Sequence, residues 1–329
     1  MARFYVTGGR QRNDALNVEE WFSYGAASIY AFDDESGEVT HCLDYQSPPE
    51  VRPAEDQANV VFKAGSIDGK NLLVCTQTEI LEYSLPDCRL VKHLSHPWLN
   101  DAHHVMRRRN GNLLVANTGL DMVLELDPEG NAVADFTAIP EEDPWDRFDK
   151  SVDYRKVVTT KPHHCHPNYV FLYKDEMWIS RFDQRDLLCL SDPSKRIDIG
   201  TEKTHDGNLL GNLVYCTTVN GWLFVSDLDT RQVVHRIDLN QITGSDKALG
   251  WCRGLHILDE KRVLVGFSRL RPSKIRENLR WVKFKMGMRE KSGGLPTRVD
   301  CFNIETRKLE WTVDLEAKGM NAVFSILPG

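Results

Sequence analysis

The chain has 329 residues, of which 41% are hydrophobic and 27% charged, and its formal net charge is −7. This composition is that of a folded globular protein and excludes a disordered, collagen-like or coiled-coil chain. Because phosphate contacts need an excess of Lys and Arg, the acidic balance also argues against general nucleic-acid binding.

The beginning of the chain resembles neither a signal peptide nor a transit peptide, and no run of about 18 apolar residues provides a transmembrane segment. We therefore expect a cytoplasmic protein. Short apolar runs at 4–7, 29–32 and 38–43 are the first predicted strands. The run at 4–7 matches the second strand of the repeat that follows, with no first strand before it.

A unit of four apolar runs separated by turn signals then recurs along the chain. Its first copy has four predicted strands, at 59–62, 71–75, 79–83 and 89–93. The same order begins again at four later positions, which are His103, Asn168, Gly207 and Arg253. Residues 321–324 form one more first strand with nothing after it.

The last strand and the strands near the start of the chain complete a sixth unit. The sequence therefore predicts an all-β fold, a six-bladed β-propeller closed by its N- and C-terminal strands, as a single domain over residues 1–329. Three insertions exceed the repeat, at 10–27, 137–165 and 268–297. Loops of this length are usually lids or binding loops, and we expect all three on one face of the propeller.

Histidines gather where the first strands begin, and these strand entries ring one mouth of the central channel. Seven of the eleven histidines lie in or beside the entries, at positions 103, 104, 163, 164, 166, 205 and 256. Neutral imidazoles that converge from different strands suit a divalent transition metal. The alternative is that each histidine only hydrogen-bonds backbone carbonyl groups of neighbouring blades.

We assign roles to twelve residues at this mouth. The predicted metal ligands are His103, His166, His205 and His256, with iron or zinc favoured and calcium as the alternative. The predicted catalytic residues are His164, His104 and Arg253, the histidines as acid or base. The predicted substrate-binding residues are Arg181, Asn117, Asn168, Asn321 and Arg269.

The third insertion contains a basic segment from Arg269 to Lys291, with nine Lys or Arg residues and two Glu. A basic lid over a polar pocket attracts a small anionic substrate, which arginine binds through paired hydrogen bonds. The alternative is that residues 269–291 dock a protein partner or a membrane surface through Trp281, Phe284 and two methionines.

The repeat, the closure by both chain ends and the polar channel mouth resemble the six-bladed propellers of the NHL, SMP-30/gluconolactonase and strictosidine synthase-like superfamily. In the lactonase and paraoxonase branch, this resemblance implies a central calcium ion held by Asn, Asp and Glu. Four residues partly fill that pattern, namely Asn59, Asn168, Asn321 and Asp101. The run of histidines and the missing glutamate depart from it. In ligand type alone, the channel is similar to that of the larger, seven-bladed carotenoid oxygenases, which bind iron.

The sequence thus favours a metal-dependent enzyme that acts on a small anionic metabolite by hydrolysis, elimination, isomerisation or oxygenation. A non-enzymatic propeller, serving as a scaffold or a ligand-binding module through the basic insertion, is the alternative. A metal-free lyase that uses the same histidines as acid and base is a third hypothesis.

Overall fold

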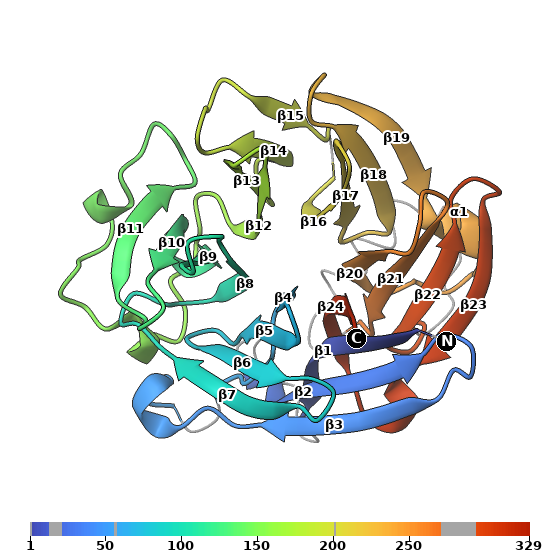
Figure 1. Cartoon of the computed structure of the whole chain (residues 1–329), viewed down its shortest axis with the longest axis horizontal. Coiled ribbons are helices and arrows are strands. Elements are labelled where there is room, and N and C mark those ends of the chain that lie inside the picture. The colour runs from blue at the N-terminus through green and yellow to red at the C-terminus, as the bar shows by residue number, and fades with distance from the viewer. Residues whose placement is uncertain (1, 13–21, 56–57, 201, 271–293) are drawn as a thin grey trace.

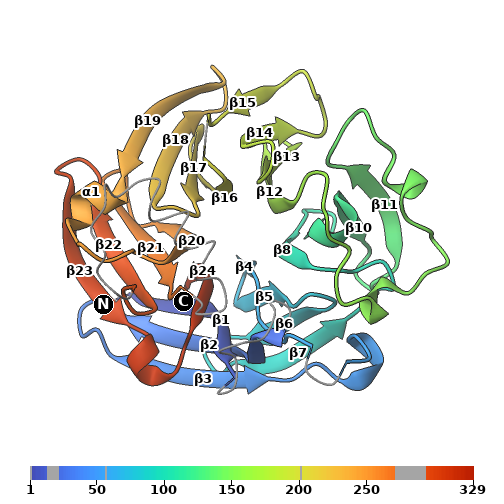
Figure 2. The same ribbon diagram turned by 180° about the vertical axis from the view of Figure 1, so that it is seen from behind.

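The computed structural model describes residues 2–12, 22–55, 58–200, 202–270 and 294–329. In these residues, six four-stranded antiparallel sheets surround a central axis, as Figures 1 and 2 show from opposite faces. The predicted six-bladed propeller is therefore confirmed.

Each sheet runs from an inner strand at the axis to an outer strand at the rim. The first contains β24 (Ala322–Pro328), β1 (Arg3–Gln11), β2 (Tyr24–Asp33) and β3 (Val39–Tyr45). The second contains β4 (Gly65–Asp68), β5 (Asn71–Cys75), β6 (Ile80–Ser84) and β7 (Arg89–Leu94). The third contains β8 (Ala102–Arg107), β9 (Leu113–Asn117), β10 (Met122–Leu126) and β11 (Ala132–Thr137).

The other three sheets follow the same order. The fourth contains β12 (Pro167–Tyr173), β13 (Glu176–Arg181), β14 (Asp186–Cys189) and β15 (Arg196–Asp198). The fifth contains β16 (Thr204–Leu210), β17 (Leu213–Thr218), β18 (Trp222–Asp227) and β19 (Gln232–Asp238). The sixth contains β20 (Trp251–Ile257), β21 (Arg262–Ser268), β22 (Arg298–Asn303) and β23 (Lys308–Asp314).

Short helices occupy the connections. They are the 3-10 helices η3 (Pro49–Val51), η4 (Thr118–Leu120), η5 (Pro144–Asp146), η6 (Tyr154–Lys156) and η8 (Glu316–Lys318), and the α-helix α1 (Leu239–Thr243). No helix in the described ranges has both the length and the hydropathy needed to cross a membrane.

The first sheet joins the two ends of the chain, as predicted. β24 pairs antiparallel with β1, with Val6 opposite Ile326. Both side chains are fully buried in one core cluster, which also contains Val299 of the neighbouring sheet. The C-terminal end of the chain thus supplies the innermost strand of a sheet whose other three strands come from the N-terminal end, which closes the ring.

The position of each strand in its sheet explains its sequence pattern. The second strand β9 is buried along its whole length because neighbouring blades cover both of its faces. The outer strand β23 instead alternates, and its Lys308 and Glu310 face solvent. A continuous buried run thus marks a second strand such as β9, and period-two alternation marks an outer strand such as β23.

The first strand of the second sheet differs from the prediction. We expected it at 59–62, but β4 spans Gly65–Asp68. Asp68 pairs with Asn71, so only Gly69 and Lys70 form the hairpin turn, and Gly69 has a φ of 60°. Such a two-residue turn fixes where the strand before it ends. The shift places Lys63 directly before the first strand, and both Lys63 and Asn59 line the cavity at the channel mouth.

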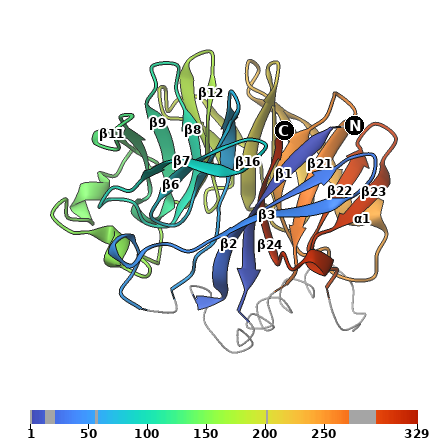
Figure 3. The same cartoon turned by 60° about the horizontal axis from the view of Figure 1, so that its bottom comes forward.

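The insertions are described to different extents. Residues 137–165 carry η5 and η6 and extend from the lower side of the disc in Figure 3. Residues 13–21 of the first insertion and 271–293 of the third lie outside the described residues. The prediction that the three insertions share one face therefore remains a prediction.

Candidate functional site

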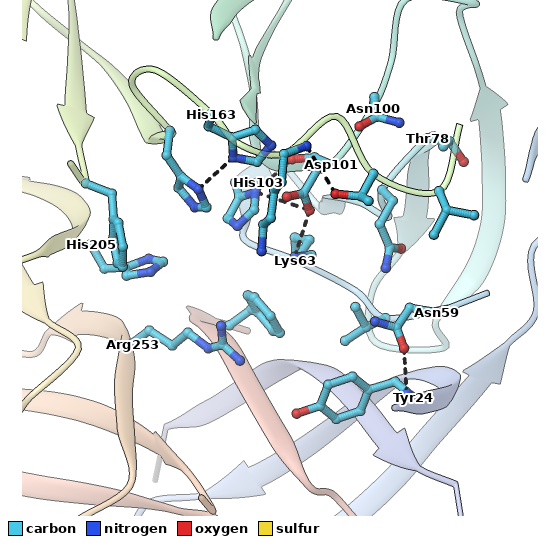
Figure 4. Close-up of a pocket in the computed structure, with 18 of the residues that line it drawn as sticks. Tyr24, Asn59, Lys63, Thr78, Asn100, Asp101, His103, His163, His205 and Arg253 are labelled. Carbon is cyan, nitrogen blue, oxygen red and sulfur yellow. Dashed lines mark hydrogen bonds and ion pairs between the residues drawn. The ribbon is translucent and has the colours of Figure 1, made fainter. Parts of the chain in front are cut away.

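A cavity of about 870 Å³ opens at one mouth of the channel (Figure 4). All six blades, through their strands or connecting loops, and the 137–165 insertion contribute to its lining. Its chemically active side chains are four histidines, four cations and two carboxylates, namely His103, His163, His166, His205, Lys63, Lys161, Lys203, Arg253, Asp101 and Asp183. The cavity lining thus has more cations than carboxylates, in a chain whose net charge is −7.

The four histidine rings lie close together. The ring centroid of His103 is 4.9 Å from that of His166 and 6.4 Å from that of His205. His163 and His166 share a hydrogen bond between their Nδ1 atoms at 3.0 Å. One of these two nitrogens carries the shared proton. His163 belongs to the run of histidines in the sequence, but it is not among the twelve predicted site residues.

The local structure fixes the tautomer of His103. Its Nδ1 lies 2.7 Å from the carbonyl oxygen of Asp101, which can only accept, so Nδ1 is the donor. In the neutral ring, Nε2 then carries the lone pair. Burial, together with the nearby Lys63 cation, holds the pKa of His103 well below its usual value.

Lys63 and Asp101 form an ion pair in the cavity, with Nζ 3.2 Å from Oδ1. Burial alone would raise the pKa of Asp101, but the Lys63 ammonium and the neighbouring histidines lower it well below its usual range. The backbone of Asp101 is left-handed, with a φ of 47°. Non-glycine residues adopt this conformation at an energetic cost, and such residues cluster at functional sites.

One buried carboxylate holds the loop that presents His163 and His166. Asp121 accepts hydrogen bonds from three consecutive backbone N–H groups, those of His164, Cys165 and His166, at 2.8, 3.0 and 2.9 Å. Arg147 donates to the same carboxylate at 2.7 Å. His166 is held with a φ of 62°. Asp121 therefore determines how the loop enters the cavity.

The predicted residues His103, His166, His205 and Arg253 do meet in this cavity. Burial also lowers the pKa of His166 to about 3 and that of His205 well below its usual value. These rings are neutral near pH 7, as metal ligands or general bases must be.

The other three predicted histidines lie elsewhere. His104 stacks on Tyr169, with the ring centroids 3.5 Å apart. His164 pairs with Glu142, its Nδ1 lying 2.8 Å from Oε2. His256 packs against Phe4 at a centroid distance of 5.2 Å. Strand alternation separates His104 from His103, because neighbouring residues in a strand face opposite ways.

The predicted substrate-binding residues make structural contacts outside the cavity lining. Arg181 donates to buried Asp186 from Nε and a terminal nitrogen, at 2.7 and 2.6 Å. The Asn117 carboxamide holds the backbone of Asn100, whose own side chain donates to the carbonyl groups of Tyr154 and Val157. These contacts anchor the inner wall of the 137–165 insertion.

The remaining three residues of that set also have partners in the fold. Asn168 donates to the carbonyl oxygen of Thr204 at 2.9 Å, and Asn321 accepts from the Gln11 backbone at 2.8 Å. Arg269 pairs with Glu316 at 2.9 Å. The basic segment that follows Arg269 lies almost wholly outside the described residues, so the partner-docking alternative for 269–291 remains a prediction.

Among the residues that the structure describes, no group of three or more His, Cys, Asp or Glu side chains is placed to hold a metal ion. The hydrogen bond between His163 and His166 occupies one nitrogen of each ring. Metal binding by the histidines therefore remains a prediction, and it requires the side chains to move from the positions described.

Comparisons with known proteins identify the architecture. No family model matches the chain, and no curated protein matches it. A Bacteroides caccae protein of unknown function is similar over 100% of this chain and 99% of its own, with a TM-score of 0.63 and 14% identity.

A chain from the crystal structure of a mitotic checkpoint complex is similar over 98% of this chain and 84% of its own, with a TM-score of 0.51 and 9% identity. At these identities the likeness shows the fold alone. Membership of the NHL and SMP-30 superfamily therefore remains a prediction, and what is shown is the propeller architecture.

Proposed function

We propose that this protein is an enzyme that acts on a small anionic metabolite in the channel-mouth cavity, promoted by a divalent metal ion bound to His103, His166 and His205. The supporting observation is that four histidines and four cationic side chains meet in one cavity of an acidic protein. A cavity with an excess of one charge attracts ions of the opposite sign and raises their local concentration.

The spacing of the rings supports the metal part of the proposal. Two imidazoles bound to one zinc ion at about 2.0 Å have ring centroids about 5 Å apart. The His103 and His166 rings are already at 4.9 Å, and Nε2 of His103 carries its lone pair. The His205 ring, at 6.4 Å from that of His103, would have to move closer. His166 would exchange its contact with His163 for the metal. Imidazole ligands favour iron or zinc over calcium, which prefers oxygen ligands.

The His103 tautomer also favours a second candidate, a metal-free lyase. In it, Nε2 of His103 takes a proton from the substrate as general base. The lowered pKa of His103 keeps the ring neutral near pH 7, as this role requires. Arg253 and Lys63 would hold the anionic group of the substrate in both candidates.

Metal analysis of the purified protein distinguishes the two candidates. After loading with zinc or iron and removal of excess ion, we expect about one equivalent of metal per chain. His166→Ala should lose this metal. His235→Ala is the matched control, because His235 is exposed on the outer strand β19, and it should keep the metal. Equal metal content in the wild type and His166→Ala would contradict the metal site.

Turnover tests whether the protein is an enzyme. Small carboxylates and phosphate esters are incubated with the protein, and conversion is followed by NMR. We expect His103→Gln to abolish conversion in both candidates while leaving the fold unchanged by circular dichroism. Conversion that persists at the wild-type rate in His103→Gln would rule out a chemical role for this ring.

A further inference from the structure

Two cations from different sheets lie against one aromatic ring in the cavity. The guanidinium carbon of Arg253, on β20, is 3.6 Å from the ring centroid of Phe324, on β24. The Nζ atom of Lys63, just before β4, is 4.8 Å from the same centroid. Figure 4 shows Arg253 and Lys63 approaching from different sides. The propeller axis thus brings together residues that are far apart in the chain.

The fold holds both cations in place. Arg253 donates from Nε to the carbonyl oxygen of Val323 at 3.1 Å, while its guanidinium stacks on Phe324. Lys63 is 8% exposed and donates to Asp101. Asp101 offsets one of these two positive charges, and Asp206 is a further carboxylate that interacts electrostatically with Arg253. The cavity lining as a whole has four cationic side chains and two carboxylates, so Coulomb attraction favours an anion there.

An apolar wall adjoins this pair of cations. Tyr24, Val61, Ala322 and Phe324 form one buried cluster. Three of these residues, Tyr24, Val61 and Phe324, also line the cavity. The ring that carries the cations is thus part of a continuous apolar surface. The cavity volume of about 870 Å³ also lies at the upper end of the range for drug-sized ligands, roughly 300–1,000 Å³.

We infer that Lys63 and Arg253 form a binding subsite for the oxyanion of an amphipathic ligand, whose apolar or aromatic body lies along Tyr24, Val61 and Phe324. The planar fork of Arg253 suits the paired oxygens of a carboxylate or a phosphate, and the Lys63 ammonium adds positive charge at another point of the same pocket. The inference rests on the proposed function, from which it takes the anionic ligand, and it specifies that this ligand is amphipathic. It requires no metal and no chemical step.

Calorimetric titration of the full-length protein after chelation of metals tests this subsite. The probes are phenylacetate, phenyl phosphate, acetate, inorganic phosphate and phenylacetamide, which has the body of phenylacetate without its charge. We expect phenylacetate or phenyl phosphate to bind at least about tenfold more tightly than the other three probes, because each charged hydrogen bond contributes about 1.5–3 kcal/mol. Comparing phenylacetate with phenyl phosphate identifies the preferred oxyanion.

Charge-removing variants locate the binding. Arg253→Met and Lys63→Met should each lower the affinity for the preferred aromatic anion at least about tenfold. Lys174→Met is the matched control, because Lys174 is exposed and pairs with Asp229. The affinity of this variant for the preferred aromatic anion should be unchanged. If Lys63→Met does not fold by circular dichroism, Arg253→Met alone decides. Tyr24→Ala should lower the affinity for the aromatic anions and leave the affinities for acetate and inorganic phosphate unchanged.

Three results would overturn the inference. They are affinities for both aromatic anions no higher than that for phenylacetamide, unchanged affinity in Arg253→Met, and no binding of either aromatic anion at about 10 mM. Because metals are removed first, binding without any metal site would support the subsite and contradict the metal part of the proposed function. A metal site in a protein that does not bind the anions would support the metal part of the proposed function and contradict the subsite.

Discussion

The carboxylate of Asp121 accepts a hydrogen bond of 2.9 Å from the backbone N–H of His166. The two residues are 45 positions apart, and this bond, with those from His164 and Cys165, holds the histidine loop against the third sheet. The arrangement satisfies three backbone donors with one ionised group. Burial alone would raise the pKa of Asp121, but these N–H groups and Arg147 lower it.

Asp121→Asn should therefore loosen the loop. The amide has no charge and one fewer accepting oxygen, so at least one buried backbone donor loses its partner. We expect the free energy of unfolding to fall by about 2–4 kcal/mol, measured by urea denaturation. Asp149→Asn is the control, because Asp149 accepts from the Ser151 backbone on the same insertion but is exposed. A loss no larger than that of the control would contradict this role of Asp121.

The pairing of Arg181 with Asp186 leads to a second prediction. Asp186 has no exposed surface, so Arg181→Met leaves a buried carboxylate with only the half-exposed Arg196 as its cationic partner. We expect a loss of about 3–5 kcal/mol, and Arg181→Met with Asp186→Leu should recover most of it. Urea denaturation of the two single variants and the double variant measures the coupling. The exposed pair Lys174 and Asp229 is the reference, with about 0–1 kcal/mol expected.

Ligand binding separates this structural role from the predicted substrate-binding role of Arg181. Folded Arg181→Met should bind the aromatic anions of the subsite experiment with wild-type affinity. An affinity loss comparable to that of Arg253→Met would show that Arg181 contacts the ligand after all.

The propeller was predictable because it depends on local patterns that repeat. Each hairpin is formed by neighbouring residues, and six copies of one pattern specify a closed ring. The error at 59–62 arose because those apolar residues resemble a strand, whereas the turn at Gly69 sets the register. Counting back from that turn would have placed Lys63 at the channel.

The site was only partly predictable. His103, His166 and His205 follow from their strand entries, but two other features depend on distant contacts. Asp121 lies on a different sheet from the loop that it holds, and Phe324 joins Lys63 to Arg253 only after the ring closes. Conversely, Arg181 and Asn117 occupy equivalent positions in the repeat, but their side chains hydrogen-bond to other parts of the fold. A position in the repeat thus predicts toward which face a side chain points, but it does not predict which groups that side chain contacts.

His256 leads to a prediction about pH. Its ring packs on Phe4, and burial lowers its pKa to about 4 from the usual 6.5. The folded state therefore binds fewer protons than the unfolded state between these values. The stability that this group contributes is fully present above pH 6.5 and is lost as the pH falls toward 4.

His256→Phe removes this dependence and keeps an aromatic ring against Phe4. Relative to the wild type, the variant should gain about 1–2 kcal/mol of stability on going from about pH 7.5 to about pH 5. Thermal unfolding at the two pH values measures the difference. His235→Phe, on the exposed face of β19, is the control and should show no such change. A stability difference for His256→Phe that does not vary with pH would contradict the buried neutral ring.

In the proposed function, histidines from separate blades form one chemical centre at the channel mouth. A crystal structure of metal-loaded protein, with anomalous diffraction recorded at the zinc and iron absorption edges, tests it most directly. We predict one anomalous peak in the cavity, at about 2.0–2.2 Å from nitrogen atoms of His103, His166 and His205. A well-ordered cavity without such a peak, in which His163 and His166 keep their mutual hydrogen bond, would contradict the metal centre.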